Sequence, residues 1–326
     1  MQIGFLEEAV AVATLRDVAE CARVSLTTVS YVLNNKGAIS ESTRRRVLHA
    51  IREVGYTRRG PFGRTLAYIG EGSFVGTLKQ AAAEYGFEIH HVSGAGYVPD
   101  CTGDSAYAYS GTIVYGGLWS RSALEEIVSR GPTILLGASF PSVRSDEIWI
   151  DNAGAVYTAV EHLVSMGHVH VGLINGPIET VTTAEKRVGF ERALRDLPGV
   201  VGTCVNASGF TTSAGYEAIR RLFSKQPHIT AVISGDVPLT HGILEFCRSE
   251  GIAVGSALSL ISIRDERSLE QSEPPITVLP IPALEISREA ISHLVTRINN
   301  PKLPGRRLLI RPEMIHRQSV QPAPKV

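Results

Sequence analysis

The chain has 326 residues, more than one ordinary domain holds, which predicts two or three compact units. Its composition, 44% hydrophobic and 20% charged with no net charge, is typical of a globular protein and argues against a fibrous or disordered chain. Residues 13–66 carry ten Lys or Arg against four acids, a net charge of +6, whereas residues 67–326 carry 22 against 26, a net charge of −4. A basic head on a mildly acidic body suits a protein that binds a polyanion through one end.

The cysteines and the N-terminal residues indicate where the protein works. Cys21, Cys101, Cys204 and Cys247 lie far apart without a CxxC pair, so neither a zinc site nor a disulfide framework is indicated. The first residues, MQIGFLEEAVAV, lack the basic start of a signal peptide. No apolar run approaches the ~20 residues needed to span a bilayer. We therefore expect a cytoplasmic protein without membrane contact.

The head is predicted to hold three short helices. Thr14, with Asp17 three residues on, is an N-cap signal for a helix over 15–22, and a tight turn separates it from a second helix over 27–33. Ser40 is placed to cap a third helix. The residues expected to face inward are Leu15, Val18, Ala19, Ala22, Val29, Leu33, Val47, Leu48, Ile51 and Val54. Two helices joined by so short a turn are typical of a helix-turn-helix, whose second helix enters the major groove of DNA.

The segments TLRDVAECARVSLTTVSYVLN and STRRRVLHAIREVGY closely resemble the opening of the lactose/galactose repressor (LacI/GalR) family of bacterial transcription regulators. The resemblance implies that Leu26, Thr27 and Tyr31 contact bases. It implies phosphate contacts from Thr14, Ser25, Thr28, Ser30, Asn34, Ser40, Thr43 and Tyr56. Some members carry an arginine at the position of Tyr31, which can bind guanine through two hydrogen bonds; tyrosine cannot, so a different operator sequence is expected. The alternative is a generic three-helix cap with a solvated basic face.

Short apolar runs alternate with amphipathic segments through the body of the chain. The predicted strands cover 66–70, 88–92, 111–115, 133–136, 170–174, 231–234 and 258–263, and the predicted helices 75–86, 121–130, 153–166, 184–195, 213–223 and 240–250. Gly167 is placed to end one of these helices. This alternation predicts an α/β fold with parallel sheets and ligand sites at the carboxyl ends of the strands.

Several body segments also resemble the effector-binding core of the same family, among them IDNAGAVYTAVEHLVSMGHVHVGLINGP, KRVGFERAL, TAVISGD and LLIRPEMIHRQS. The resemblance implies a three-helix head joined to a two-lobed, periplasmic-binding-protein-like effector domain. The expected division is a helix-turn-helix domain at 13–57, a shortened linker at 58–66 and an effector domain at 67–326. The first lobe would comprise 67–149 plus 281–299, and the second 150–280 plus 300–326.

The resemblance also places four effector-binding residues, Lys186, Phe210, Asp236 and Arg264, in a cleft between the lobes. Phe210 falls at an aromatic platform, Lys186 at the arginine of an R-x-x-G-F pattern, and Arg264 where the family usually has an aspartate. Gly235 replaces an asparagine that often precedes Asp236. A sugar site needs carboxylates and amides that accept hydroxyl protons, and this site has exchanged acceptors for cations. We therefore expect an anionic effector, a carboxylate or phosphate ester, held by Lys186 and Arg264 beside Phe210.

Two alternatives to the anionic effector remain open at this point. One is a neutral ligand. The other is a degenerate pocket in which Arg264 pairs internally with Asp265, Asp236 or Glu185.

The linker departs from the family pattern. Members commonly carry a hinge helix, PNxxARxL, that wedges a leucine into the minor groove. Here the sequence is TRRGPFGRTL, in which two glycines and a proline oppose a helix. Leu66 is left with two roles, groove wedge or strand start, and Arg58 and Arg59 are expected to contact the DNA. Residues 94–108 depart as well, because Gly, Pro and Asp dominate where a helix is expected.

These features predict a DNA-binding transcription regulator, expected to repress, that binds a pseudo-palindromic operator as a homodimer at the nucleoid while a small effector modulates its affinity. The ending RQSVQPAPKV has no leucine heptads, which favours a dimer over a coiled-coil tetramer. The alternative is a cytoplasmic small-molecule sensor whose altered linker has impaired DNA binding. No cofactor or catalytic motif is indicated, so no enzyme is expected. His168 and His170 fall at a turn into a strand, which argues against a metal site.

Overall fold

The computed structural model describes residues 14–33, 39–54, 65–70, 74–92, 109–116, 119–137, 143 and 145–324. By its internal contacts the chain forms two units. The first lies within 1–135, 140–145 and 290–304, and the second within 136–139, 146–289 and 305–326. The division therefore falls inside one long helix, α11 (Ala283–Asn299).

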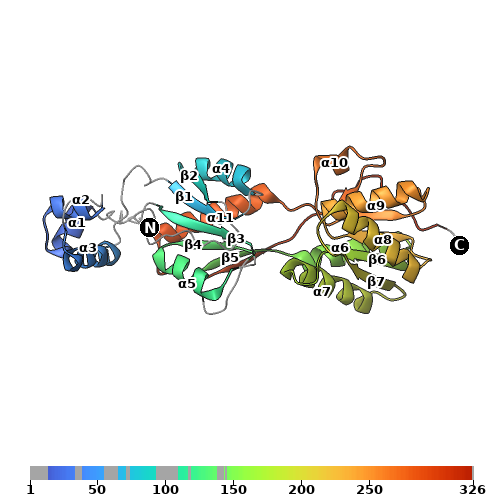
Figure 1. Cartoon of the computed structure of the whole chain (residues 1–326), viewed down its shortest axis with the longest axis horizontal. Helices are drawn as coiled ribbons and strands as arrows, with labels where there is room; N and C mark the ends of the chain where they lie inside the picture. The colour runs from blue at the N-terminus through green and yellow to red at the C-terminus, as the bar shows by residue number, and fades with distance from the viewer. Residues whose placement is uncertain are drawn as a thin grey trace, which may run out of the picture. The chain divides into compact units, whose positions relative to one another are not determined.

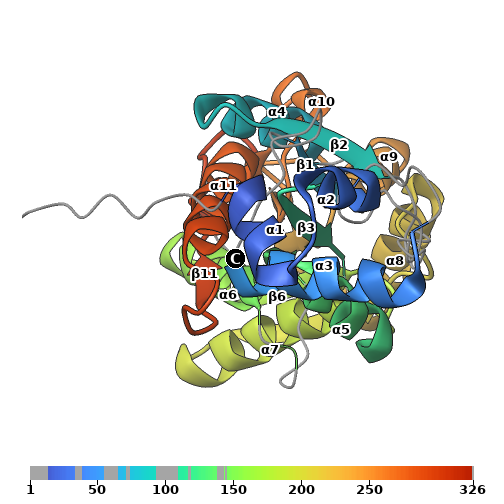
Figure 2. The same cartoon turned by 90° about the vertical axis from the view of Figure 1, so that its left-hand side faces the viewer.

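The head consists of α1 (Leu15–Ala22), α2 (Leu26–Leu33) and α3 (Glu41–Val54), drawn in blue in Figure 2. Thr14 caps α1 as predicted, in a capping box with Asp17. Ser40 caps α3, and its Oγ accepts a hydrogen bond from the Thr43 amide at 3.2 Å. Arg23 adopts the left-handed conformation (φ 50°) and makes the turn between α1 and α2.

One apolar cluster holds these three helices together. Its fully buried members are Val18, Ala19, Ala22, Val29, Val32, Val47 and Ala50, and Leu15, Val24, Ile39, Leu48, Ile51 and Val54 pack around them. Nine of the ten predicted inward residues lie in this cluster. The side chain of the tenth, Leu33, lies outside the described residues.

The remaining elements form two sheets and the helices around them, many of which are labelled in Figure 1. The strands are β1 (Thr65–Ile69), β2 (Glu88–Val92), β3 (Gly111–Tyr115), β4 (Thr133–Leu136), β5 (Asp146–Ile150), β6 (His170–Asn175), β7 (Val201–Asn206), β8 (Ala231–Ser234), β9 (Ser259–Ser262), β10 (Thr277–Val278) and β11 (Arg307–Ile310). The helices among them are α4 (Val75–Glu84), α5 (Arg121–Arg130), α6 (Asn152–Ser165), α7 (Val181–Asp196), α8 (Thr212–Lys225), α9 (Val237–Ser249) and α10 (Arg267–Glu270).

One sheet has six strands in the order β11-β5-β4-β3-β1-β2, and the other has five in the order β10-β9-β8-β6-β7. The ladders β1–β2, β1–β3, β5–β11, β6–β7, β6–β8, β8–β9 and β9–β10 are parallel. In the five-stranded sheet Asn175 is level with Asn206, and Ile174 with Ser234, so β6, β7 and β8 end side by side. The predicted α/β fold with parallel sheets is confirmed.

Each face of the five-stranded sheet carries its own core. One cluster joins α8 and α9 to the sheet through residues such as Leu222, Ile243 and Phe246. The other joins α6 and α7 through Val160, Leu163 and Phe190. Because helices cover both faces, the strands between them are apolar on both sides.

The caps of the second unit explain several helix boundaries. Gly167 (φ +89°) follows α6, and the amides of Gly167 and His168 donate to the carbonyls of Val164 and Leu163, the pattern of a Schellman C-cap. Helix α9 begins at Val237 rather than at the predicted residue 240. Asp236 caps it and proline is tolerated in the first turn of a helix, so Pro238 does not delay its start.

The sequence left the role of Leu66 open and missed strand β7, and the structure gives a physical reason for each outcome. Leu66 lies inside β1 and is fully buried, so of its two open roles it takes the strand position rather than that of a groove wedge. Strand β7 was missed because it is the outer strand of its sheet, and of its six residues only Val205 is buried. Asn34, Tyr56, Arg58 and Arg59, most of the linker, and residues 94–108 lie outside the described residues. Within the described part of the chain no helix is long and apolar enough to cross a membrane.

Candidate DNA-binding surface and effector site

Helix α2 presents a face that the head does not use for packing. Leu26 and Tyr31 are 45% and 44% exposed, unusually high for large apolar or aromatic side chains, and Thr27 is exposed beside them. Val29 and Val32, on the opposite side of the same helix, are buried. The three residues predicted to contact bases therefore point away from the core, Leu26 and Thr27 from the first turn of α2 and Tyr31 from its C-terminal half.

The residues predicted to contact phosphate gather at helix starts. Ser25 caps α2, where its Oγ accepts from the Thr28 amide at 3.0 Å and lies 2.8 Å from the Thr28 hydroxyl. Ser40 and Thr43 form the same arrangement at the start of α3, with 2.9 Å between their hydroxyl oxygens. Backbone amides and the helix dipole at such positions favour anions, which a DNA phosphate would supply. Ser30, in the middle of α2, is half-buried.

The predicted effector residues lie where the order in which the chain adds strands to the five-stranded sheet reverses. The chain moves from β6 outward to β7 and then crosses back to β8 on the other side of β6. The carboxyl ends of β6 and β8 meet there, joined by a hydrogen bond of 2.8 Å from the Gly235 amide to the Ile174 carbonyl. Ligands of open α/β sheets bind at such a switch point.

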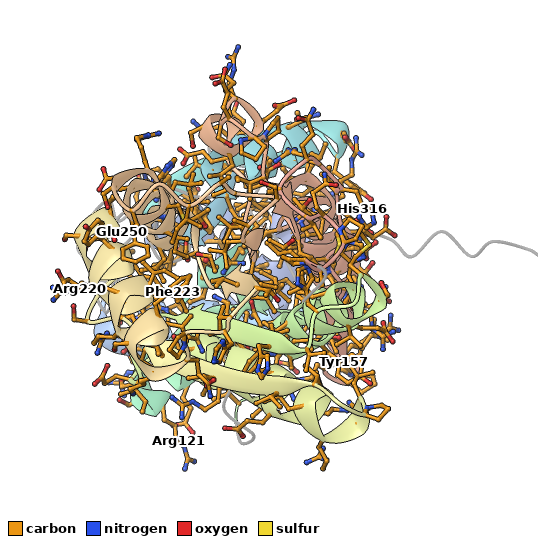
Figure 3. All side chains as sticks on the ribbon, turned by 90° about the vertical axis from the view of Figure 1, so that its right-hand side faces the viewer. Arg121, Tyr157, Arg220, Phe223, Glu250 and His316 are labelled. Atoms are coloured by element: carbon orange, nitrogen blue, oxygen red, sulfur yellow. The ribbon has the colours of Figure 1, made fainter. Side chains whose placement is uncertain are left out.

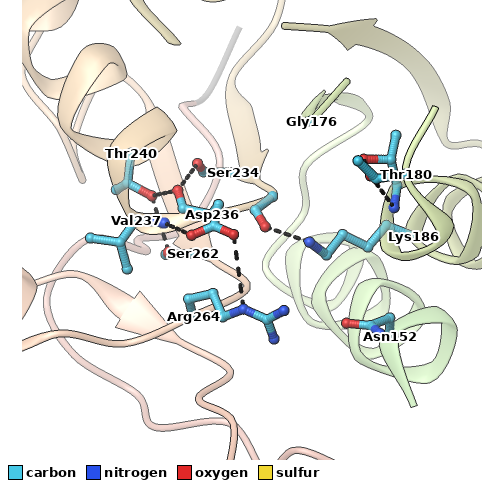
Figure 4. Close-up of polar contacts among 12 residues, drawn as sticks. Asn152, Gly176, Thr180, Lys186, Ser234, Asp236, Val237, Thr240, Ser262 and Arg264 are labelled. Carbon is cyan, nitrogen blue, oxygen red and sulfur yellow. Dashed lines mark hydrogen bonds and ion pairs between the residues drawn. The ribbon is translucent and has the colours of Figure 1, made fainter. Parts of the chain in front are cut away.

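Lys186 reaches this point from α7. Its side chain has no exposed surface, and its Nζ donates a hydrogen bond to the Gly235 carbonyl at 2.6 Å (Figure 4). Burial and, to a smaller extent, the nearby Arg264 guanidinium lower the pKa of Lys186, whereas Asp236 and Glu185 raise it, and together they bring it to about 7. A lysine so placed is close to losing its proton at neutral pH.

Arg264 and Asp236 approach each other beside Lys186. Arg264 Nε lies 3.9 Å from Asp236 Oδ2, a long contact for an ion pair, while the Val237 amide donates to the other Asp236 oxygen at 2.8 Å. Asp265 is engaged elsewhere, because Arg317 donates to both of its carboxylate oxygens at 2.9 and 2.6 Å. Among the internal partners considered for Arg264, Asp236 is the one at ion-pair distance.

Phe210 lies on the β6 side of the same site and is 37% exposed. Its ring covers Gly176, the residue that follows β6: a Cβ built on Gly176 would stand 2.3 Å from the ring and 2.9 Å from the Thr183 hydroxyl. Gly176 therefore lets the ring approach the backbone closely, beside Thr183, which lies one helical turn before Lys186 on α7. The structure thus brings Lys186, Asp236 and Arg264 together and places Phe210 against Gly176.

Asn152 follows Asp151, the N-cap of α6, and adds a polar group that the capping motif of these two residues does not predict. It is 4% exposed, and its Nδ2 donates to Glu185 at 2.8 Å, yet its Oδ1 is buried without a hydrogen-bond partner. Burial raises the pKa of Glu185. Figure 4 shows Asn152 on the Lys186 side of the site. The capping motif Asp151-Asn152 gave no signal for this role, because only the fold places α6 beside α7.

His168, which was considered as a metal ligand, makes structural hydrogen bonds. His168 is buried and hydrogen-bonds Thr230, Ser259 and the Gln321 carbonyl at 2.9 to 3.0 Å. In the part of the chain that the structure describes, no three His, Cys, Asp or Glu side chains group as metal ligands.

A helix-turn-helix head followed by two parallel α/β sheets, one with a polar site at its switch point, defines a DNA-binding transcription regulator with a small-molecule-binding core. Residues 14–59 match the family model of bacterial regulatory proteins, lacI family, and residues 160–320 match that of the periplasmic binding protein-like domain. The chain therefore carries a lacI-family helix-turn-helix domain and a periplasmic binding protein-like domain.

Similar proteins extend over nearly its whole length. The transcriptional regulator DegA of Bacillus subtilis is 27% identical over 95% of this chain and 98% of DegA, and the transcriptional repressor CytR of Escherichia coli is 28% identical over 96% and 97%. Among solved structures, a CelR–cellobiose complex matches with a TM-score of 0.69 and 25% identity over 94% of this chain and 99% of CelR. The lac repressor dimer bound to operator and ONPF matches with a TM-score of 0.68 and 20% identity over 95% of this chain and 99% of the repressor chain. The named relatives are transcriptional regulators, not enzymes.

Proposed function

We propose that the protein represses transcription by binding a pseudo-palindromic operator as a homodimer in the cytoplasm, and that a small anionic effector alters its affinity for the operator. The observation that carries the first part is the exposed face of α2, where Leu26, Thr27 and Tyr31 stand free of the core of the head. A short helix with such a face can place three side chains on base edges in the major groove. Arg58, Arg59, Asn34 and Tyr56 complete the proposed DNA contacts.

The effector part of the proposal rests on charge. CelR, whose structure is a cellobiose complex, binds a neutral sugar, whereas this chain presents Lys186 and Arg264 beside Asp236 and Phe210. A phosphate or carboxylate bound there would supply the opposite charge and accept hydrogen bonds from both cations.

The operator proposal is tested by selecting genomic fragments bound by the purified full chain. The variant Thr27→Ala/Tyr31→Ala removes two proposed base contacts, and Thr296→Ala/Tyr85→Ala removes the same residue types from exposed positions elsewhere. We expect the wild type and the control to enrich one pseudo-palindromic motif that the first variant loses. Enrichment of no motif by the wild type, with or without metabolite extract, would overturn the proposal and favour a ligand sensor.

A further inference from the structure

A pocket lies in the second unit, at the carboxyl end of β7. Its volume is about 370 Å³, and its walls come from the loop after β6, the end of β7 and the neighbouring sides of α7 and α8. This volume is at the lower end of the ~300–1,000 Å³ of small-molecule pockets. None of the four proposed effector residues lines it, so it is a separate place from the switch-point site.

Three cationic side chains line this pocket: Arg187 from α7, and Arg221 and Lys225 one turn apart on α8. Glu179 is the one acid of the lining. In the described chain no carboxylate lies at ion-pair distance from these three cations.

Neighbouring arginines on the same helices differ in this respect. Arg192 on α7 pairs with Asp196, and Arg220 on α8, labelled in Figure 3, pairs with Glu217 at 2.7 Å. The pocket therefore carries an excess of positive charge that its surroundings do not neutralise.

Asn206 fixes both arginines in place. Arg187 Nη2 donates to its side-chain oxygen at 2.8 Å, and Arg221 Nη2 donates to its backbone carbonyl at 2.7 Å. The side-chain amide nitrogen of Asn206, Nδ2, is buried and has no hydrogen-bond partner. The polar groups in the pocket wall are therefore mainly donors, and a buried donor without an acceptor is costly.

We propose that this pocket binds a small anionic metabolite through a phosphate or carboxylate group, separately from the effector. Such a group accepts hydrogen bonds through several oxygens, which matches the guanidinium groups of Arg187 and Arg221 and the amide of Asn206. Lys225, an exposed residue of the lining, adds a third positive charge. A neutral sugar would leave the charge excess of the pocket uncompensated.

The test is calorimetric titration of the full chain with pyrophosphate and with citrate, which separate the phosphate from the carboxylate class. Arg221→Gln/Lys225→Gln removes two pocket cations from exposed positions, so the fold is retained. Arg195→Gln/Arg220→Gln is the control. It removes the same net charge from two exposed arginines, one on α7 and one on α8, that do not line the pocket. Arg264→Ala reports any binding of the probe at the effector residues.

We expect binding of at least one probe that weakens about ten-fold or more in Arg221→Gln/Lys225→Gln, a loss typical of removing charge-assisted hydrogen bonds. The same binding should persist in the control pair and in Arg264→Ala. The proposal is overturned if the wild type binds neither probe, if the control pair loses binding equally, or if only Arg264→Ala loses it. Because the operator experiment uses other residues and another readout, the failure of one proposal is distinguishable from that of the other.

Discussion

Lys186 Nζ lies 2.6 Å from the carbonyl oxygen of Gly235 and donates a hydrogen bond to it, from a side chain that water does not reach. A lysine on α7 is thereby tied to the residue that follows β8. The free protein keeps this cation at a cost, because burial and Arg264 both disfavour its charged form. Under the proposed function, an anion bound at this switch point would offset that cost.

The first prediction concerns the stability of the free protein. Met has nearly the shape of Lys without its charge, so Lys186→Met should raise the melting temperature at pH 6 by about 2–4 °C, although the Gly235 carbonyl loses a donor. Below pH 7 the lysine is protonated in both folded and unfolded chains, and the full cost of burial is present. As the pH rises from about 7 towards 10.5, only the unfolded chain still binds the proton, so the wild type gains stability relative to the variant.

Calorimetric melting between pH 6 and pH 10 checks this prediction. The advantage of Lys186→Met should be largest at low pH and shrink above neutrality. Lys79→Met, at an exposed position on α4, serves as the control and should show no such trend. A Lys186→Met advantage that stays constant with pH would show that the buried lysine does not titrate near neutrality.

The second prediction concerns the proposed effector site. An anion bound beside Lys186 favours its charged form, so binding should take up protons near pH 7 to 8 and weaken as the pH rises further. Titrations in buffers of different ionisation enthalpy measure this uptake. Arg264→Ala should weaken the anion about ten-fold or more. Tight binding of a neutral sugar that is insensitive to Arg264→Ala would rule out the anionic effector.

The parts of the fold that could be predicted from the sequence are those whose apolar pattern is clear. Strands β2, β3, β4 and β8 and helix α5 begin and end at the predicted residues, because each is an apolar run or stripe bounded by turn or capping residues. Strands β5, β7, β10 and β11 escaped prediction. In β11 only Ile310 is buried, so the local pattern resembles a loop.

The structure brings together three of the residues that the family resemblance places in the effector site, but their contacts could not be predicted from the sequence. The expectation of a cationic site came from Arg264, which falls where the resembling family usually has an aspartate. That Lys186 would meet Gly235, 49 residues later, depends on the parallel register of β6 with β8, which no local pattern contains. The unpartnered oxygen of Asn152 likewise follows only from the packing of α6 against α7.

The third prediction tests that packing. A Cβ on Gly189 of α7 would stand 2.1 Å from the backbone oxygen of Ala153 on α6, so Gly189→Ala must push two helices apart. Gly76, in α4, has open space where its Cβ would lie. In urea unfolding we expect Gly189→Ala to cost about 1–3 kcal/mol or more. Gly76→Ala should gain up to about 1 kcal/mol from helix propensity. Equal effects of the two substitutions would contradict the close helix approach.

The fourth prediction concerns operator sequence. Tyr31, 44% exposed on α2, offers one hydroxyl, whereas an arginine there could donate two hydrogen bonds to guanine. Tyr31→Arg should therefore introduce a preference for guanine at one position of each half-site, worth about 1–3 kcal/mol per half-site against other bases. Selection of bound fragments and binding curves at one fixed salt concentration measure it. Tyr85→Arg adds the same charge at an exposed position outside the head, so it should leave the selected motif unchanged. If Tyr31→Arg tightens binding to all sequences equally, its side chain faces phosphate rather than bases, and α2 enters the groove in another orientation.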